Sequence, residues 1–179
     1  FNRGDLFYSR RIGGLPKQYL QAFENLDSNE VVIDNPVTSK LVNVAKVSGR
    51  TKSGLGIGVM NAITSQSSAI IENTLTGETR EVETNPLVNY NIISFDQNLK
   101  NNSSIYFINL NTTRAGKFID ANVSSLGVNM VSKKSNYSLS GNIKVSQRDT
   151  NLLKNVFKAC ENDGLSHRIN IAKISGNFK

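Results

Sequence analysis

The stretch KSGLGIGVMNAIT, residues 52–64, decides the fold class of this chain, because its glycines alternate with Leu55, Ile57 and Val59. A phosphate-binding loop requires a lysine and a hydroxyl residue after its glycines, and a dinucleotide-binding fingerprint requires a helical pattern after them. Neither follows the glycines here. Side chains that alternate every second residue are typical of a β-strand, so the stretch predicts a strand with one apolar face and one face of small residues.

The same alternation recurs along the chain and predicts further strands. The segments that we interpret as extended are residues 6–12, 40–50, 54–65, 87–96, 104–113, 120–131, 137–147 and 167–178. Helical spacing is confined to residues 16–26 and 150–163, and both stretches lie in connections between strands.

The connections alternate between short and long. Residues 51–53, 97–103 and 132–136 are short and rich in turn-forming residues, residues 114–119 are intermediate, and residues 13–39, 66–86 and 148–166 are long. Strands of about ten residues with short turns at one end and long loops at the other are typical of an outer-membrane β-barrel. We therefore predict an all-β fold, an antiparallel up-and-down meander of about eight strands that forms part of a transmembrane β-barrel.

The extent of the barrel is a further expectation. The chain begins without methionine and ends on a strand-like segment, so we expect residues 1–179 to be one section of a larger barrel. We also expect short helices within the long loops 13–39 and 148–166.

Composition limits the functional classes. The net charge is +7, but the basic residues are spread over many strands without a dense run, which argues against nucleic acid as a partner. A lone cysteine, Cys160, and a lone histidine, His167, exclude a cysteine zinc site and a histidine-rich metal site. We expect no metal and no cofactor. A hydrophobic content of 38% suits a wall of which one face alone must be apolar.

Several blocks of sequence resemble a known family. They are FNRGDLFYSRRIGG (1–14), AKVSGRTKSGLGIGVMNAIT (45–64), residues 76–116, YSLSGNIKVSQ (137–147) and IAKISGNF (171–178). The chain resembles an uncharacterised barrel domain, a domain-of-unknown-function family, that follows a carbohydrate-binding family 9-like domain in surface proteins of Gram-negative bacteria. The resemblance implies a protein of the cell outer membrane with no established activity, whose partners are membrane lipid and either a glycan or another outer-membrane protein.

Two sets of residues are candidates for the two faces of the wall. Basic side chains on the lumen face would favour anions, or would only solvate the interior; they are Arg10, Arg11, Lys46, Arg50 and Lys144. The lipid-facing candidates are Leu55, Ile57, Val59, Tyr106, Ile108, Leu110, Tyr137 and Leu139. Tyr106 and Tyr137 lie near short turns, where interfacial tyrosines gather, although cross-strand packing would also explain them.

Three functions follow from these patterns. The first is a non-enzymatic outer-membrane barrel that binds or passes a substrate, which is glycan-related if the resemblance holds. The second is a soluble all-β module that binds carbohydrate or another protein. The third is a surface glycoside hydrolase, which would need a carboxylate pair from the acidic stretch that holds Glu72, Glu78, Glu81 and Glu83. Because charges alternate in that stretch, we interpret it first as a solvated hairpin.

Overall fold

The structure is a computed structural model, and it describes residue 6, residues 12–149 and residues 163–175. In these residues β-strands alternate with turns, and the helical element is the 3-10 helix η3. The elements in chain order are η3 (Tyr19–Phe23), β1 (Glu30–Asp34), β2 (Leu41–Arg50), β3 (Leu55–Thr64), β4 (Ser67–Asn73), β5 (Thr79–Asn85), β6 (Val88–Asn98), β7 (Ser104–Arg114), β8 (Asp120–Val131), β9 (Tyr137–Asp149) and β10 (Gly164–Lys173).

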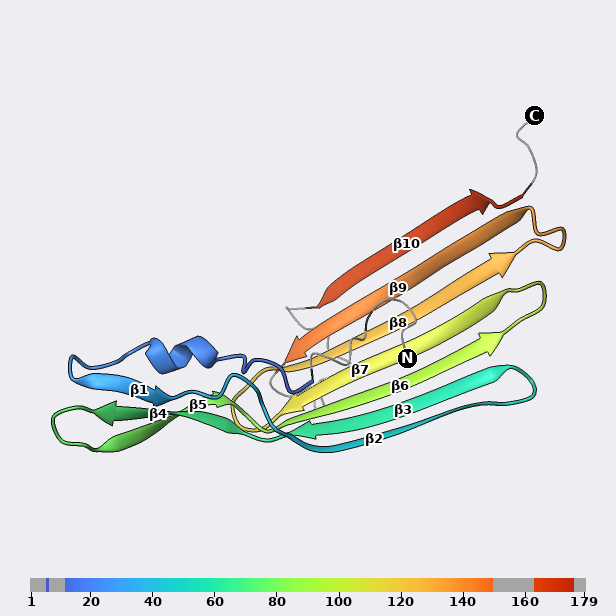
Figure 1. Ribbon diagram of the computed structural model, residues 1–179. Helices are drawn as coiled ribbons and strands as arrows, with labels where there is room; N and C mark the ends of the chain where they lie inside the picture. The colour runs from blue at the N-terminus through green and yellow to red at the C-terminus, as the bar shows by residue number, and fades with distance from the viewer. Residues whose placement is uncertain (1–5, 7–11, 150–162, 176–179) are drawn as a thin grey trace.

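The strands form two sheets (Figure 1). The larger sheet has seven strands in the order β10-β9-β8-β7-β6-β3-β2, and every neighbouring pair is antiparallel. The smaller sheet has the order β1-β4-β5, is also antiparallel and extends from one end of the larger sheet. The all-β antiparallel meander predicted from the alternation is therefore confirmed.

Seven of the predicted strands correspond to the seven strands of the larger sheet. The predicted strand 6–12 lies outside the described residues, apart from Leu6 and from Ile12, which is in a turn. The predicted helix 16–26 is reduced to the five residues of η3. The predicted helix 150–163 lies outside the described residues, except for Asp163, which is not helical.

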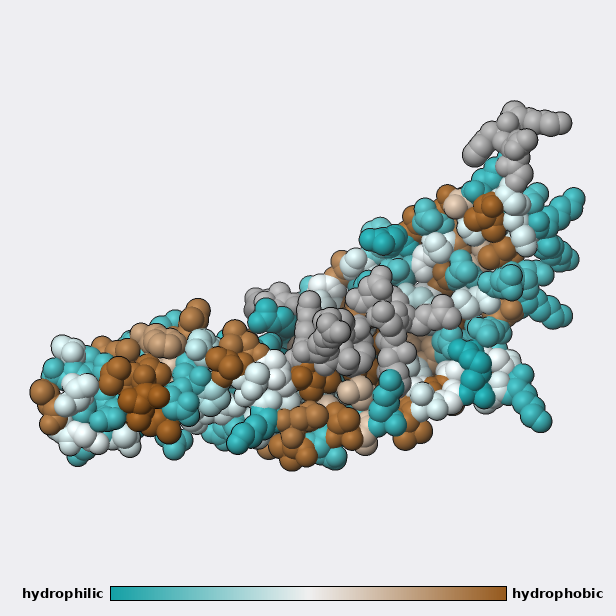
Figure 2. Space-filling model, viewed as in Figure 1, coloured by the Kyte–Doolittle hydropathy of each residue, from teal (hydrophilic) through white to brown (hydrophobic). Residues whose placement is uncertain are grey.

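Short turns join β2 to β3, β6 to β7 and β8 to β9 at one end of the larger sheet (Figure 1). The other end has the long connection from β3 to β6, which contains β4 and β5, and the short β7–β8 connection of residues 115–119. Tight backbone hydrogen bonds close the short turns, such as Leu99 N–H to the Ser103 carbonyl at 2.8 Å and Ser132 N–H to the Tyr137 carbonyl at 3.0 Å. Gly54 supplies the positive φ of 87° that the β2–β3 turn needs. Figure 2 shows hydrophilic side chains projecting from this short-turn end. The predicted alternation of connection lengths is present only in part, because the β7–β8 connection, residues 115–119, is as short as the turns at residues 99–103 and 132–136.

The long connections are more structured than predicted. Residues 66–86, predicted to be a long connection, contain the whole β4–β5 hairpin, and β1 occupies part of the loop predicted at 13–39. The loop predicted at 148–166 is shorter, because β9 runs to Asp149 and β10 begins at Gly164. The smaller sheet is stabilised by non-local packing, since Ala22 of η3, Ala69 and Ile71 are all buried. The interpretation of the acidic stretch as a hairpin is confirmed.

Arg80 on β5 and Glu30 on β1 join the two outer strands of the smaller sheet through a two-pronged ion pair. Arg80 Nε and Nη2 each donate to a carboxylate oxygen of Glu30 at 2.7 Å, and the backbone N–H of Asp27 donates to the same carboxylate at 3.0 Å. The hydrogen bonds from Arg80, followed by the one from Asp27, lower the pKa of Glu30 from 4.5 to about 2.

The ion pair predicts an acid-sensitive sheet edge. Because the pKa of Glu30 is lower in the folded chain, its stabilising contribution is complete above pH 4.5 and is lost as the pH falls from 4.5 towards 2. We expect the Glu30 side-chain carboxyl carbon to titrate by NMR with a midpoint near pH 2. In Arg80→Lys, which loses the planar fork, the midpoint should move upward. An ordinary midpoint in the unsubstituted protein would contradict this assignment.

Candidate functional site

The register of the larger sheet assigns every strand residue to one of two faces, because directly paired residues of antiparallel strands share a face. Gly56 pairs with Arg50 on one side and with Asp96 on the other. Ile57 pairs with Gly49 and Phe95. We call the face of Gly56 the basic face and the face of Ile57 the apolar face.

The basic face is strongly cationic. In the described strands, the register places one acidic residue, Asp96, and six basic residues on this face, and the six lie on four of the seven strands. The six are Lys46, Arg50, Arg114, Lys144, Arg148 and Arg168. A surface with this imbalance attracts anions.

Gly56 allows an ion pair to cross a whole strand. Arg50 Nη2 on β2 pairs with Asp96 Oδ1 on β6, although β3 lies between these strands. A Cβ atom at Gly56 would overlap Asp96 Oδ1 and lie 2.8 Å from Arg50 Nη2. Arg50 Nη1 also donates to the Gly54 carbonyl at 2.7 Å. The bare face predicted for the opening stretch thus admits side chains from both neighbouring strands.

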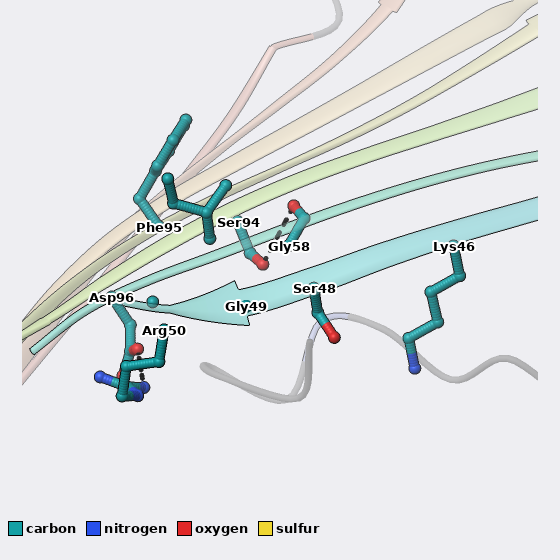
Figure 3. Close-up of a pocket in the computed structure, with 10 residues that line it drawn as sticks. Lys46, Ser48, Gly49, Arg50, Gly58, Ser94, Phe95 and Asp96 are labelled. Carbon is teal, nitrogen blue, oxygen red and sulfur yellow. Dashed lines mark hydrogen bonds and ion pairs between the residues drawn. The ribbon is translucent and has the colours of Figure 1, made fainter. Parts of the chain in front are cut away.

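A hollow of about 480 Å³ lies on the basic face beside this ion pair (Figure 3). Lys46, Ser48 and Arg50 line it from β2, and Ser94 and Asp96 line it from β6. Gly58 adds no side chain, and Ser94 Oγ donates to its carbonyl at 3.4 Å. Ile57 and Phe95 of the apolar face line it as well. The ammonium, guanidinium, hydroxyl and carboxylate groups of the lining suit a polar ligand that carries negative charge or hydroxyl groups.

A second glycine of the basic face lies beneath an aromatic ring. Tyr106 pairs with Gly127, and a Cβ atom at Gly127 would overlap the Tyr106 ring. The ring belongs to the rim of a small apolar cluster whose buried members are Met60, Ala62, Ile92 and Ile108. Leu6 and Ile12 from the N-terminal segment also pack against this cluster. The basic face is therefore partly covered by the chain itself.

The apolar face is a continuous band across all seven strands. Its members are Val47, Leu55, Ile57, Val59, Ile93, Phe95, Ile105, Phe107, Leu126, Val128, Met130, Tyr137, Leu139, Ile143, Val145, Leu165, Ile169 and Ile171. Many of these side chains are exposed, for example Ile143 at 53% and Ile171 at 75%. Contiguous apolar surface of this extent marks contact with another apolar phase or partner.

A belt of polar side chains borders this band on the same face, towards the long connections. Asn61 Nδ2 donates to the side-chain oxygens of Asn89 at 2.6 Å and Asn91 at 2.8 Å. Asn109 Nδ2 donates to Asn122 Oδ1 at 2.8 Å and to Ser124 Oγ at 2.9 Å. Asn122 in turn donates to Gln147 at 3.3 Å. Apolar and carboxamide side chains thus divide the face into two zones along the strands.

The register corrects part of the predicted lipid-facing set. Leu55, Ile57, Val59, Tyr137 and Leu139 share the apolar face, as predicted. The expectation that Tyr106, Ile108 and Leu110 share it is wrong, because they pair with Asp96, Ser94 and Ile92 of the basic face. Ile108 is fully buried there, so its side chain serves the small apolar cluster.

The predicted basic residues divide differently. The register brings Lys46, Arg50 and Lys144 to one face. Arg10 and Arg11 lie outside the described residues. Sequence reasoning missed Arg114, Arg148 and Arg168. The alternation of β9 and β10 would have placed Arg148 and Arg168 opposite the apolar residues, but on β7 Arg114 shares the parity of Tyr106 and Ile108, so alternation gave no such signal there.

The smaller sheet holds the carboxylates that a hydrolase would need. Glu81 and Glu83 lie two residues apart on β5 and therefore share one face of that strand. In the described part of the chain, no group of three or more metal-ligating side chains gathers. No helix in the described ranges has the length and hydropathy needed to cross a membrane.

These observations define a class, an all-β protein built on an antiparallel meander with one apolar and one cationic face. A model of the family described as "Domain of unknown function (DUF5916)" matches residues 1–179. The chain belongs to that family. No curated protein and no solved structure matches it.

Proposed function

We propose that this chain is a section of the wall of a non-enzymatic outer-membrane β-barrel, which binds or passes an anionic substrate. The observation that carries the proposal is the division of the larger sheet into an exposed apolar face and a cationic face. In a barrel wall the apolar face meets lipid and the other face lines a polar lumen. Tyr137 then lies in the interfacial girdle, and Lys46, Arg50 and Lys144 point into the lumen.

The size of the apolar band supports this assignment. Along β9 the band runs from Tyr137 to Val145, which at ~3.3 Å per residue is about 26 Å of strand. A strand tilted by about 40° then covers roughly 20 Å of membrane depth, close to the ~25 Å band of known barrels. The carboxamide belt follows where the strands would leave the hydrocarbon.

Lysines at the short turns support the placement of the apolar band in a membrane. Lys52, Lys100, Lys133 and Lys134 lie in the three short turns and are exposed, and these turns contain no acidic residue. An ammonium next to an apolar band suits the phosphate groups of lipid headgroups. In the proposed orientation these turns face the periplasm, and the long connections with the smaller sheet lie outside.

The soluble alternative explains the apolar face less well. A sandwich buries the apolar faces of its sheets against each other. Here Leu6 and Ile12 pack on the basic face, while Leu165, Ile169 and Ile171 on the apolar face are 72–75% exposed. The two open edges, β2 and β10, also need pairing within a membrane, so we propose that further strands complete the barrel.

The substrate proposal combines charge with the family resemblance. Six basic residues against one acidic residue favour anions, and the hydroxyl groups of Ser48 and Ser94 suit a polyhydroxylated ligand. A carbohydrate-binding family 9-like domain beside the barrel, which the resemblance implies, would fit a glycan. We therefore propose an acidic glycan as the substrate class.

Ion selectivity of the reconstituted protein tests this function. We expect the protein expressed from its complete gene to require detergent, to insert into planar lipid bilayers and to favour anions over cations. Lys46→Glu should shift the reversal potential towards cations, because the lumen loses a cation and gains a carboxylate. Lys52→Glu, with the same charge change on a short turn, should shift it much less. A protein that stays monodisperse without detergent and forms no conductance would contradict the proposal.

A further inference from the structure

A second, smaller hollow lies away from the Arg50–Asp96 pair, at the long-connection end of the basic face. It encloses about 90 Å³ between the segment that precedes η3 and the ends of β6 and β7. Lys17 and Arg114 line it together with the polar residues Ser39, Asn85 and Tyr90. At ~30 Å³ per water molecule the space holds about three waters or one small oxyanion.

Two cations, Lys17 and Arg114, line this hollow, and the charge of a third, Arg148, acts on both. Partial burial, followed by the positive charges of Arg114 and Arg148, lowers the pKa of Lys17. Arg148 lies on the basic face of β9, where it pairs with Ala121. The nearby carboxylate, Asp120, accepts a hydrogen bond from the backbone N–H of Arg114 at 2.7 Å. The guanidinium of Arg114 donates to the Ile119 carbonyl. The charges of Lys17, Arg114 and Arg148 therefore repel one another across a partly dry space.

The fold holds the walls of the hollow in place. Gly13 adopts a positive φ of 74°, and a Cβ atom there would lie 3.0 Å from the Ser39 carbonyl oxygen. The N–H of Ser39 donates to the Gly14 carbonyl at 3.2 Å, and the N–H of Gln18 donates to the Thr84 carbonyl at 3.0 Å. Pro16 is fully buried between these contacts. The backbone around the hollow is thus held in place before any ligand arrives, which lowers the cost of binding.

We propose that the hollow formed by Lys17, Ser39, Tyr90 and Arg114, with Arg148 beside it, is a binding site for an oxyanion. An oxyanion there accepts hydrogen bonds from ammonium, guanidinium and hydroxyl donors, and its charge offsets the repulsion among the three cations. The oxyanion is either free phosphate or sulfate, or the carboxylate or sulfate of an acidic glycan, since all share this chemistry. The site depends on how the segment before η3 packs against the ends of β6 and β7, and it does not depend on membrane insertion.

Calorimetric titration in detergent solution tests the site. We expect sulfate, phosphate or glucuronate to bind with a stoichiometry of one per chain, and glucose, which is neutral, to give no heat. Lys17→Met should weaken binding about tenfold to a hundredfold, the effect of removing one charge-assisted hydrogen bond. Lys52→Met removes the same charge from a short turn and should leave the affinity unchanged. Binding of glucuronate alone identifies the carboxylate of an acidic glycan as the ligand, whereas binding of phosphate alone identifies a free anion. If sulfate binds, a comparison with glucose 6-sulfate separates a glycan sulfate, which binds as tightly as sulfate or more tightly, from the free ion, which binds alone.

Two outcomes would overturn the proposal. The first is the absence of heat for every anion, and the second is an equal loss of affinity in Lys17→Met and Lys52→Met, which would indicate a diffuse charge effect. An NMR titration of the Lys17 ammonium gives a readout that needs no variant. We expect its pKa to rise when sulfate saturates the site, because the anion compensates Arg114 and Arg148. An unchanged pKa at saturation would place the anion elsewhere.

Discussion

Ile143→Arg should destabilise the protein in lipid by about 2–4 kcal/mol, the cost of an arginine at the lipid-facing midplane of a barrel. Ile143 is half exposed and lies near the middle of the apolar band, where it pairs with Leu126 and His167. In hydrocarbon the guanidinium loses its hydration without gaining a partner. Urea unfolding in liposomes, followed by tyrosine fluorescence, measures the difference.

Ser140→Arg is the matched control for this experiment. Ser140 lies on the same strand but on the basic face, where it pairs with Asn129 and Asn170. In the proposed barrel an arginine there would enter the polar lumen, so we expect a change within about 0.5 kcal/mol, as for an ordinary surface substitution. Equal destabilisation by the two variants, or a larger cost for Ser140→Arg, would contradict the assignment of the faces.

Gly127→Ala should destabilise the larger sheet by about 1–3 kcal/mol, the range for overpacking. The Tyr106 ring occupies the space above Gly127 that a Cβ atom would need. The ring cannot simply move away, because it packs against the cluster around Met60 and Ile108. The same denaturant titration gives the change in free energy of unfolding.

A double variant identifies the cause. Tyr106→Ser/Gly127→Ala should be less destabilised than the sum of the two single variants, because the methyl group then fills space that the ring has left. Gly49→Ala is a control, since nothing lies within 4 Å of a Cβ atom at Gly49. Additive single effects would show that ring overlap is not the reason for the glycine.

Period-two alternation was enough to predict the strands of the larger sheet. It was not enough to predict on which side of the sheet each set of alternating side chains lies. On β7 both faces are apolar, because Ile105 and Phe107 alternate with Tyr106 and Ile108. The choice between them depends on pairing with β6 and β8, which is long-range. The lipid-facing side predicted for β7 is therefore the side that Leu6 and Ile12 cover.

Other differences also have long-range causes. The hairpin β4–β5 carries little apolar alternation, since η3 supplies the packing partner from a distant part of the chain. A signal was present in Asn73 and Gly77, which form the hairpin turn with the Gly77 N–H donating to the Asn73 carbonyl. Asp96 reads as a turn former at a strand end, yet it pairs with Arg50 across Gly56, a contact that only the three-strand register reveals.

The central claim is that the apolar face meets lipid and the basic face meets water. Spin labels placed singly at residues 138–145 of β9, in a Cys160→Ser background reconstituted in liposomes, test it most directly. We predict that oxygen, which concentrates in lipid, relaxes labels at positions 139, 141, 143 and 145, whereas a water-soluble nickel complex relaxes those at 138, 140, 142 and 144. Accessibility to the nickel complex at both sets, or the opposite alternation, would contradict the account.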